Sequence, residues 1–223
     1  METDHTVVER RLLDRALRPD TVALDAGCGR RTRLRDHRDR IVRLVGVDTD
    51  DDAGRANPHV DEFVHADLDE ALPFGDASFD LVYANFVVEH LARPQQAFAE
   101  WRRVLEPDGT LVLLTSNRAS PFLRGGDLLP HRLRLLIKRR GAGVEERDVY
   151  PTRYLANTPS RLAEATAAAG FEPVAVELVG TAHRYGARIP GAAAVLRTVE
   201  RMLPAARRST IVAAYRPLRV RNV

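Results

Sequence analysis

The feature that most constrains this chain is an apolar run that ends in two closely spaced glycines. Residues 21–25 (TVALD) have the composition of a buried strand, and Gly27 and Gly29 follow directly. Residues 32–40 beyond them are predicted to form a short polar helix. Glycine lets the backbone turn sharply and lets a ligand lie against it, and a helix N-terminus suits a carboxylate or phosphate. This order of elements predicts a parallel α/β sheet with a nucleotide-like ligand at its edge.

Short apolar strands alternate with helical stretches along the chain, as in a parallel sheet that is covered on both faces. Pro107 and Gly109 predict a tight turn before one of the strands. The pattern predicts an α/β, doubly wound, Rossmann-like fold. The predicted strands are residues 21–25, 42–48, 62–65, 79–84, 110–115, 171–178 and 210–215, and the predicted helices are residues 6–17, 32–40, 94–105, 160–169 and 191–203.

We expect a single domain over residues 1–223. Its core comprises residues 1–118, 160–182 and 209–223, and two insertions, residues 119–159 and 183–208, are expected to form a helical cap. No apolar run is long enough to span a bilayer, and the first residues lack an apolar signal core, so we expect a soluble cytoplasmic protein. Cys28 is the only cysteine, which agrees with a reducing compartment.

The net charge of +3 does not indicate a nucleic-acid partner, because acidic residues are interspersed among the basic ones. Lys138 is the only lysine, and we attribute the excess of arginine to coding bias in a GC-rich bacterial genome. Residues 128–140 (LLPHRLRLLIKRR) combine leucines with clustered charge. They are interpreted as a helical lid, as an interfacial helix that contacts a membrane or a lipid-like substrate, or as a nucleic-acid contact, and we favour the lid.

Two further carboxylates follow Asp25 at intervals that match successive strands. Asp48 ends the second predicted strand, and Asp67 lies just beyond the third. The carboxyl ends of parallel strands share one edge of a sheet, and an acid at the second strand accepts hydrogen bonds from ribose hydroxyls. Each acid taken alone is better explained as a solvated turn residue or a helix cap. Their combined spacing favours a shared nucleotide site.

Residues 21–117 resemble the class I S-adenosylmethionine-dependent methyltransferases with a methyltransferase type 11 domain. The similar segments are LDAGCG, VGVD, HADLDEALPFGDASFDLVYANFVVEHL and WRRVLEPDGTLVLLTS. The resemblance implies a seven-stranded sheet with an antiparallel last strand, and an enzyme that converts S-adenosylmethionine into S-adenosylhomocysteine. It also implies cofactor contacts with the methionine part, the ribose, the adenine and the region beneath the sulfonium. The residues concerned are Asp25, Gly27, Cys28, Gly29, Asp48, Thr49, Asp67, Leu68 and Asn85.

Arg31 departs from the family pattern, which has a third glycine at this position. Three interpretations are open. Arg31 pairs with the carboxylate of the cofactor, it points to solvent from a slightly reshaped loop, or it marks a degraded site with weak affinity.

Methyl transfer from a sulfonium needs alignment above all, and a general base only where the acceptor loses a proton. His90, in NFVVEHL, is the best candidate for such a base, although a local structural hydrogen bond is the more common role for a histidine there. Tyr150, Arg153, Tyr154 and Asn157 are candidates for substrate contact or for anchoring a polar loop. The histidines show no metal-ligand spacing, so no metal site is predicted.

The sequence therefore predicts methyl transfer to a small-molecule acceptor such as a secondary metabolite, a glycan or a lipid precursor. A non-catalytic protein that binds S-adenosylmethionine or S-adenosylhomocysteine, or a scaffolding protein, is the first alternative. A nicotinamide-dependent oxidoreductase is the second, and the lack of a third glycine at Thr32 argues against it. A monomer and a homodimer both remain open.

Overall fold

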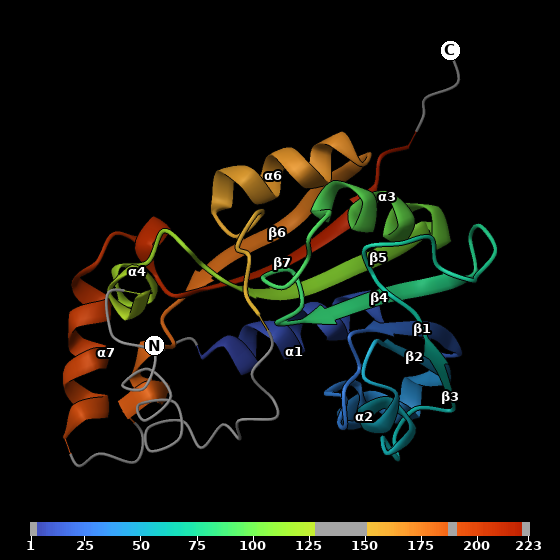
Figure 1. The fold of residues 1–223 in the computed structure, drawn as a ribbon, viewed down its shortest axis with the longest axis horizontal. Coiled ribbons are helices and arrows are strands. Elements are labelled where there is room, and N and C mark those ends of the chain that lie inside the picture. The colour runs from blue at the N-terminus through green and yellow to red at the C-terminus, as the bar shows by residue number, and fades with distance from the viewer. Residues whose placement is uncertain (1–3, 128–150, 187–190, 220–223) are drawn as a thin grey trace.

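The computed structural model describes residues 4–127, 151–186 and 191–219. Seven strands form one sheet in these ranges (Figure 1). The strands are β1 (Thr21–Ala26), β2 (Ile41–Asp48), β3 (Glu62–His65), β4 (Phe79–Asn85), β5 (Leu105–Ser116), β6 (Phe171–Val179) and β7 (Thr210–Pro217). The α-helices are α1 (His5–Ala16), α2 (Asp51–Arg55), α3 (Pro94–Val104), α4 (Pro121–Asp127), α6 (Pro159–Ala168) and α7 (Ala192–Met202).

The strand order is β3-β2-β1-β4-β5-β7-β6. The first five strands in this order pair in parallel, and β7 runs antiparallel to both of its neighbours, β5 and β6. The predicted doubly wound fold, the seven strands and the antiparallel last strand are therefore confirmed. Because β1, β2, β3 and β4 are parallel, the loops that follow them all leave the sheet at one edge.

Each face of the sheet is covered by helices that bury an apolar stripe (Figure 1). Helices α3 and α6 cover one face, where Phe98 and Trp101 lie fully buried in the same cluster as Phe171. Helix α1 covers the other face, where Leu12 and Leu13 pack in the same cluster as strand residues of β1, β4 and β5. This two-sided burial explains why the central strands are continuous apolar runs.

The segment between β1 and β2 is not the regular helix that we predicted. Residues Leu34–Arg40 form a 3₁₀ segment, and His37 leaves the helical region with φ −128° and ψ 17°. Only Leu34 and His37 of this segment are buried, so it has too narrow an apolar face to stabilise an α-helix. The prediction of a regular helix was wrong because this narrow apolar face buries too little to stabilise one.

The predicted turn at Pro107 and Gly109 lies within the bounds of strand β5 and not before that strand. Strand β5 begins at Leu105, and the register shifts where Leu105 pairs with Phe79 but Thr110 pairs with Leu81. The residues between these two pairs leave the pairing with β4, and a Cβ on Gly109 would lie 3.0 Å from the carbonyl oxygen of Glu106, as expected where the chain turns tightly. Helices α2 and α4 were not predicted, and both are short.

Tyr150 and the segment 128–140 lie outside the described residues, so their predicted roles remain predictions. In the part of the chain that the structure describes, no helix is long and apolar enough to cross a membrane. The same residues contain no group of three or more His, Cys, Asp or Glu side chains that could hold a metal ion.

Candidate functional site

The two glycines of the turn after β1 have different structural roles. Gly27 has φ +83°, and a Cβ there would collide with Cγ2 of Val87. Gly29 has φ +47°, and a Cβ there would meet no atom of the described chain within 4 Å. Gly27 is therefore required by packing against the loop after β4. The space beside the Cα of Gly29 is instead free for a ligand to approach the backbone.

Backbone and side-chain hydrogen bonds hold this turn in place. The amides of Gly27 and Cys28 both donate to the carbonyl oxygen of Val47, at 2.8 and 3.0 Å. Nδ2 of the buried Asn57 donates to the carbonyl oxygens of Cys28 and Gly29, at 3.2 and 3.1 Å. The turn is thus anchored from β2 and from the segment beyond α2.

Cys28 packs as a small buried residue inside the turn. Its Sγ lies 2.7 Å from the position that a Cβ on Gly46 would occupy. Burial is the main cause that raises the pKa of the Cys28 thiol to about 12. A thiol with this pKa stays protonated near neutral pH, so it is not a nucleophile.

Asp25 is a buried acid, and its Oδ1 has no hydrogen-bond partner among the described residues. Burial is the first cause that raises the pKa of Asp25 to about 7, and the charges of Asp48 and Glu9 raise it further, while a hydrogen bond with the Thr32 side chain opposes the shift. An unpartnered buried carboxylate is costly unless a cation or a hydrogen-bond donor meets it. Asp25 is therefore suited to a positively charged ligand group.

Asp48 continues the same edge of the sheet. Its Oδ2 accepts from the amide of Gly29 at 2.8 Å, and its Oδ1 accepts from the amide of Asp50 at 2.9 Å. Each carboxylate oxygen retains a second lone pair for a ligand hydroxyl. Thr49, the next residue, is exposed. Asp48 is thus placed to bind a ligand at the end of β2.

Asp67 and Leu68 follow β3 at this edge. Asp67 is exposed and its carboxylate accepts from the amide of Asp69, whereas the Leu68 side chain is buried in the core. Of these two residues, Asp67 presents a carboxylate to solvent and Leu68 contributes mainly to packing.

The loop after β4 carries Asn85 and His90. The side-chain oxygen of Asn85 is buried and has no hydrogen-bond partner in the described residues. Nδ1 of His90 lies 2.7 Å from the carbonyl oxygen of Pro151. A carbonyl oxygen only accepts, so Nδ1 carries the hydrogen and Nε2 is the basic nitrogen of the neutral ring.

Glu89 joins the ends of β4 and β5 to the segment that begins at Pro151. Its buried carboxylate accepts from the hydroxyls of Thr115 and Ser116, at 2.8 and 2.9 Å. Its carbonyl oxygen accepts from the amides of Arg153 and Tyr154, at 2.7 and 3.1 Å. The structure therefore brings the segment with the predicted substrate residues against the edge that carries Asn85 and His90.

Asn157 and Tyr154 add to this junction. Nδ2 of the buried Asn157 donates to Oγ1 of Thr115 at 2.5 Å, and the amide of Arg118 donates to the Asn157 carbonyl oxygen at 2.6 Å. The Arg118 guanidinium stacks over the Tyr154 ring at 5.4 Å. These contacts attach the segment of Asn157 and Tyr154 to the end of β5, and a substrate role for Tyr154 stays a prediction.

Comparison with known proteins identifies the family. Residues 24–113 match the family model that is described as a methyltransferase domain. The chain carries a methyltransferase domain. The match covers most of β1 to β5, the strands that present the glycine turn, Asp48 and Asn85. The predicted methyltransferase type 11 family is thereby confirmed.

A curated relative of the methyltransferase domain matches about half of this chain. A malonyl-acyl-carrier-protein O-methyltransferase of Enterobacter lignolyticus is 35% identical over 123 residues, which are 52% of this chain and 49% of that protein. The chain thus spans about half the length of this curated relative. The identity is enough to relate the domains, but the activity of the whole protein does not follow from it.

Solved structures share the fold at low sequence identity. A geranyl diphosphate C-methyltransferase from Streptomyces coelicolor has a TM-score of 0.65 at 15% identity, over 96% of this chain and 80% of its own. The 4+2 cyclase SpnF has a TM-score of 0.61 at 21% identity, over 95% of this chain and 80% of its own. Because one of these names describes a different reaction, the shared fold alone does not specify the chemistry.

Arg31 is exposed at the position of the family's third glycine. No hydrogen bond or ion pair links its side chain to the described residues of the methyltransferase domain. The Arg31 side chain is thus exposed to solvent, and its pairing with a cofactor carboxylate stays a prediction. The turn around it remains ordered by Val47 and Asn57, so the substitution does not dismantle the loop.

Sequence reasoning missed three residues that organise the site. Asn57 donates hydrogen bonds to the glycine turn, and Glu89 accepts them from the end of β5. Glu9 of α1 accepts a hydrogen bond from Arg33, which follows the glycine turn. Glu89 precedes His90 directly, and an acid at that place, just after an apolar strand, was a usable signal. Asn57 and Glu9 carry no such signal, because their partners lie far along the chain.

Proposed function

We propose that this protein transfers a methyl group from S-adenosylmethionine to a small-molecule acceptor. The unpartnered, buried Oδ1 of Asp25 beside the open backbone of Gly29 is the observation that carries the proposal. The methyltransferase domain and the fold neighbours, one of them solved with S-adenosylhomocysteine, support the same cofactor. A secondary metabolite, a glycan or a lipid precursor would each qualify as the acceptor.

The residues present fit this cofactor. Asp25 would receive the ammonium group, since its buried Oδ1 has no hydrogen-bond partner among the described residues and gains from a cation. Gly29 would allow close approach of the amino-acid part, and Asp48 would accept hydrogen bonds from the ribose hydroxyls. Asp67 with Leu68 would contact the adenine, and Asn85 would lie beneath the sulfonium. Bound there, the cofactor would supply an already activated methyl group.

The chain's own task is then to orient the acceptor and exclude water. The hydrogen bonds to the Glu89 carbonyl oxygen hold Arg153 and Tyr154 at the loop after β4, which suits them to contact the acceptor. His90, whose Nδ1 lies 2.7 Å from the carbonyl oxygen of Pro151, would take the proton of an acceptor hydroxyl. Carbon or nitrogen acceptors that lose their proton late would not need this step.

Isothermal titration and labelled methyl transfer test the proposal. We expect S-adenosylhomocysteine to bind the purified full chain and the control variant Glu172→Ala with equal affinity, because Glu172 is exposed on β6. Transfer of labelled methyl groups to a panel of small metabolites should follow. Absence of binding heat with both S-adenosylmethionine and S-adenosylhomocysteine at high protein concentration would overturn the proposal.

The role of His90 has a separate test. His90→Ala should lower turnover of a hydroxyl acceptor by about 100-fold or more, the range that general base catalysis contributes, and should leave the affinity for S-adenosylhomocysteine unchanged. Retained turnover would remove His90 from the mechanism. Cofactor binding without transfer to any acceptor would favour the non-catalytic alternative.

A further inference from the structure

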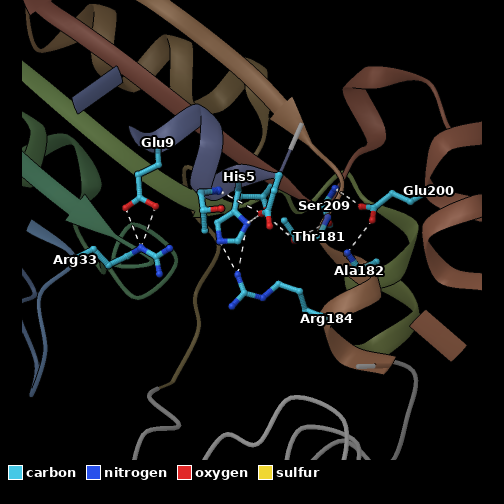
Figure 2. A network of polar contacts seen from close by, with 11 residues as sticks. His5, Glu9, Arg33, Thr181, Ala182, Arg184, Glu200 and Ser209 are labelled. Atoms are coloured by element: carbon cyan, nitrogen blue, oxygen red, sulfur yellow. Dashed lines mark hydrogen bonds and ion pairs between the residues drawn. The ribbon is translucent and has the colours of Figure 1, made fainter. Parts of the chain in front are cut away.

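Glu9 of α1 meets Arg33, which follows the glycine turn, in a close polar contact (Figure 2). Nε of Arg33 donates to both carboxylate oxygens of Glu9, at 3.1 and 3.0 Å. The hydroxyl of Tyr83 donates to the same carboxylate. Glu9 is only 3% exposed, so its carboxylate is a fixed anchor for the guanidinium.

The guanidinium of Arg33 has donors to spare. It carries five N–H groups, and only Nε is used by Glu9. Its two Nη groups make no hydrogen bond with the residues that the structure describes, and its side chain is 38% exposed. Glu9 therefore orients a guanidinium fork whose outer face is available to a carboxylate.

This pair belongs to the same polar cluster as Asp25. Tyr83 is the register partner of Asp25 on the neighbouring strand, and paired residues of parallel strands project to one face. Thr32, which hydrogen-bonds with Asp25, directly precedes Arg33. An acid with one unpartnered oxygen, Oδ1 of Asp25, and an oriented cation thus accompany the glycine turn. Together they complement an α-amino acid zwitterion.

We propose that Arg33, oriented by Glu9, binds the carboxylate at the amino-acid end of the cofactor, opposite the ammonium that Asp25 receives. This inference rests on the proposed function. It also explains how this site can bind a carboxylate although no regular helix, with its positive N-terminal end, follows the turn. The 3₁₀ segment offers little dipole, so an arginine side chain supplies the positive charge.

Two ligands that differ at the amino-acid end test the inference by isothermal titration. S-Adenosylhomocysteine carries the zwitterion, and 5′-methylthioadenosine shares the adenosine and thioether but lacks it. Arg33→Met should weaken binding of S-adenosylhomocysteine by about 10- to 100-fold, the value of a charge-assisted hydrogen bond. Its affinity for 5′-methylthioadenosine should stay within about twofold, because the change removes no contact to the nucleoside.

Arg31→Met is the matched comparison, since it removes an equal charge from an exposed position of the same loop. We expect it to leave both affinities unchanged. Loss of S-adenosylhomocysteine affinity in Arg31→Met but not in Arg33→Met would overturn the inference. An equal loss of affinity for both ligands in Arg33→Met would show that Arg33 has a structural role, and would also overturn the inference.

Arg33→Met leaves the buried Glu9 without its cation, which can unfold the protein. The double variant Glu9→Gln with Arg33→Met removes both charges and keeps the test decisive. A wild-type chain that binds neither ligand would refute the proposed function itself. A wild-type chain that binds both ligands, with Arg33→Met equal to it for S-adenosylhomocysteine, would refute only the role of Arg33.

Discussion

Asp25 and Glu89 are two buried acids at the same edge of the sheet, and they differ in what surrounds them. Glu89 has a hydroxyl donor at each carboxylate oxygen, from Thr115 and Ser116. Asp25 has one oxygen without a partner among the described residues, beside a glycine that leaves open backbone. A satisfied buried acid holds the structure together, whereas an unsatisfied one is available to a ligand. The comparison separates the scaffold of this site from its binding surface.

The glycines of the turn should show the largest contrast. Gly27→Ala should lower the free energy of unfolding by about 2–5 kcal/mol, because it adds overpacking against Val87 to the strain of a positive φ. Gly29→Ala should cost only about 1 kcal/mol, from the strain alone. Chemical denaturation measures both. Equal losses would contradict the different roles of the two glycines.

Asp25→Asn should weaken binding of S-adenosylhomocysteine by about 10- to 100-fold, because a charged hydrogen bond to the ammonium is lost. Isothermal titration measures this, with Glu172→Ala as the control on an exposed acid. Unchanged affinity would show that Asp25 is not part of the ligand surface.

The same variant should change the pH dependence of stability. The pKa of Asp25 is raised from 3.8 to about 7 in the folded protein, so the native state holds this proton more tightly than the unfolded chain. Its contribution to stability is complete below about pH 3.8 and is lost as pH rises through about 7. Asp25→Asn should remove this loss, which thermal unfolding at about pH 5 and about pH 8 detects. An unaltered pH profile would contradict the burial argument.

Glu89→Ala should lower the free energy of unfolding by about 1–3 kcal/mol, because the hydroxyls of Thr115 and Ser116 lose their acceptor. Methyl transfer should fall as well, while the affinity for S-adenosylhomocysteine stays the same. Denaturation and titration together check this. A selective loss of cofactor affinity would place Glu89 on the binding surface and remove its contrast with Asp25.

Asp67→Asn should have the smallest effect. Asp67 is exposed and accepts one backbone hydrogen bond, from Asp69, so the free energy of unfolding should change by no more than about 0.5 kcal/mol in chemical denaturation. A large loss of stability would show that this turn supports the sheet more than its exposure indicates.

The sequence by itself determined the strands, the glycine turn and the acid at the end of β2. These features are local: a turn requires glycine for steric reasons, and a buried strand requires an apolar run. Residues 24–113, where the family match lies, also contain the strands β2, β3 and β4, which follow the predicted ranges closely. The predicted positions of Asp25, Gly29 and Asp48 at one edge follow from parallel pairing alone.

Only the tertiary structure decided which side chains the turn meets. The contacts of Asn57, Glu89 and the pair of Glu9 with Arg33 join segments that are far apart in the chain. No local pattern encodes such contacts, since they depend on how helices and loops pack over the sheet. The 3₁₀ segment after the glycine turn is decided the same way, because the narrow apolar face of Leu34 and His37 could not stabilise a regular helix.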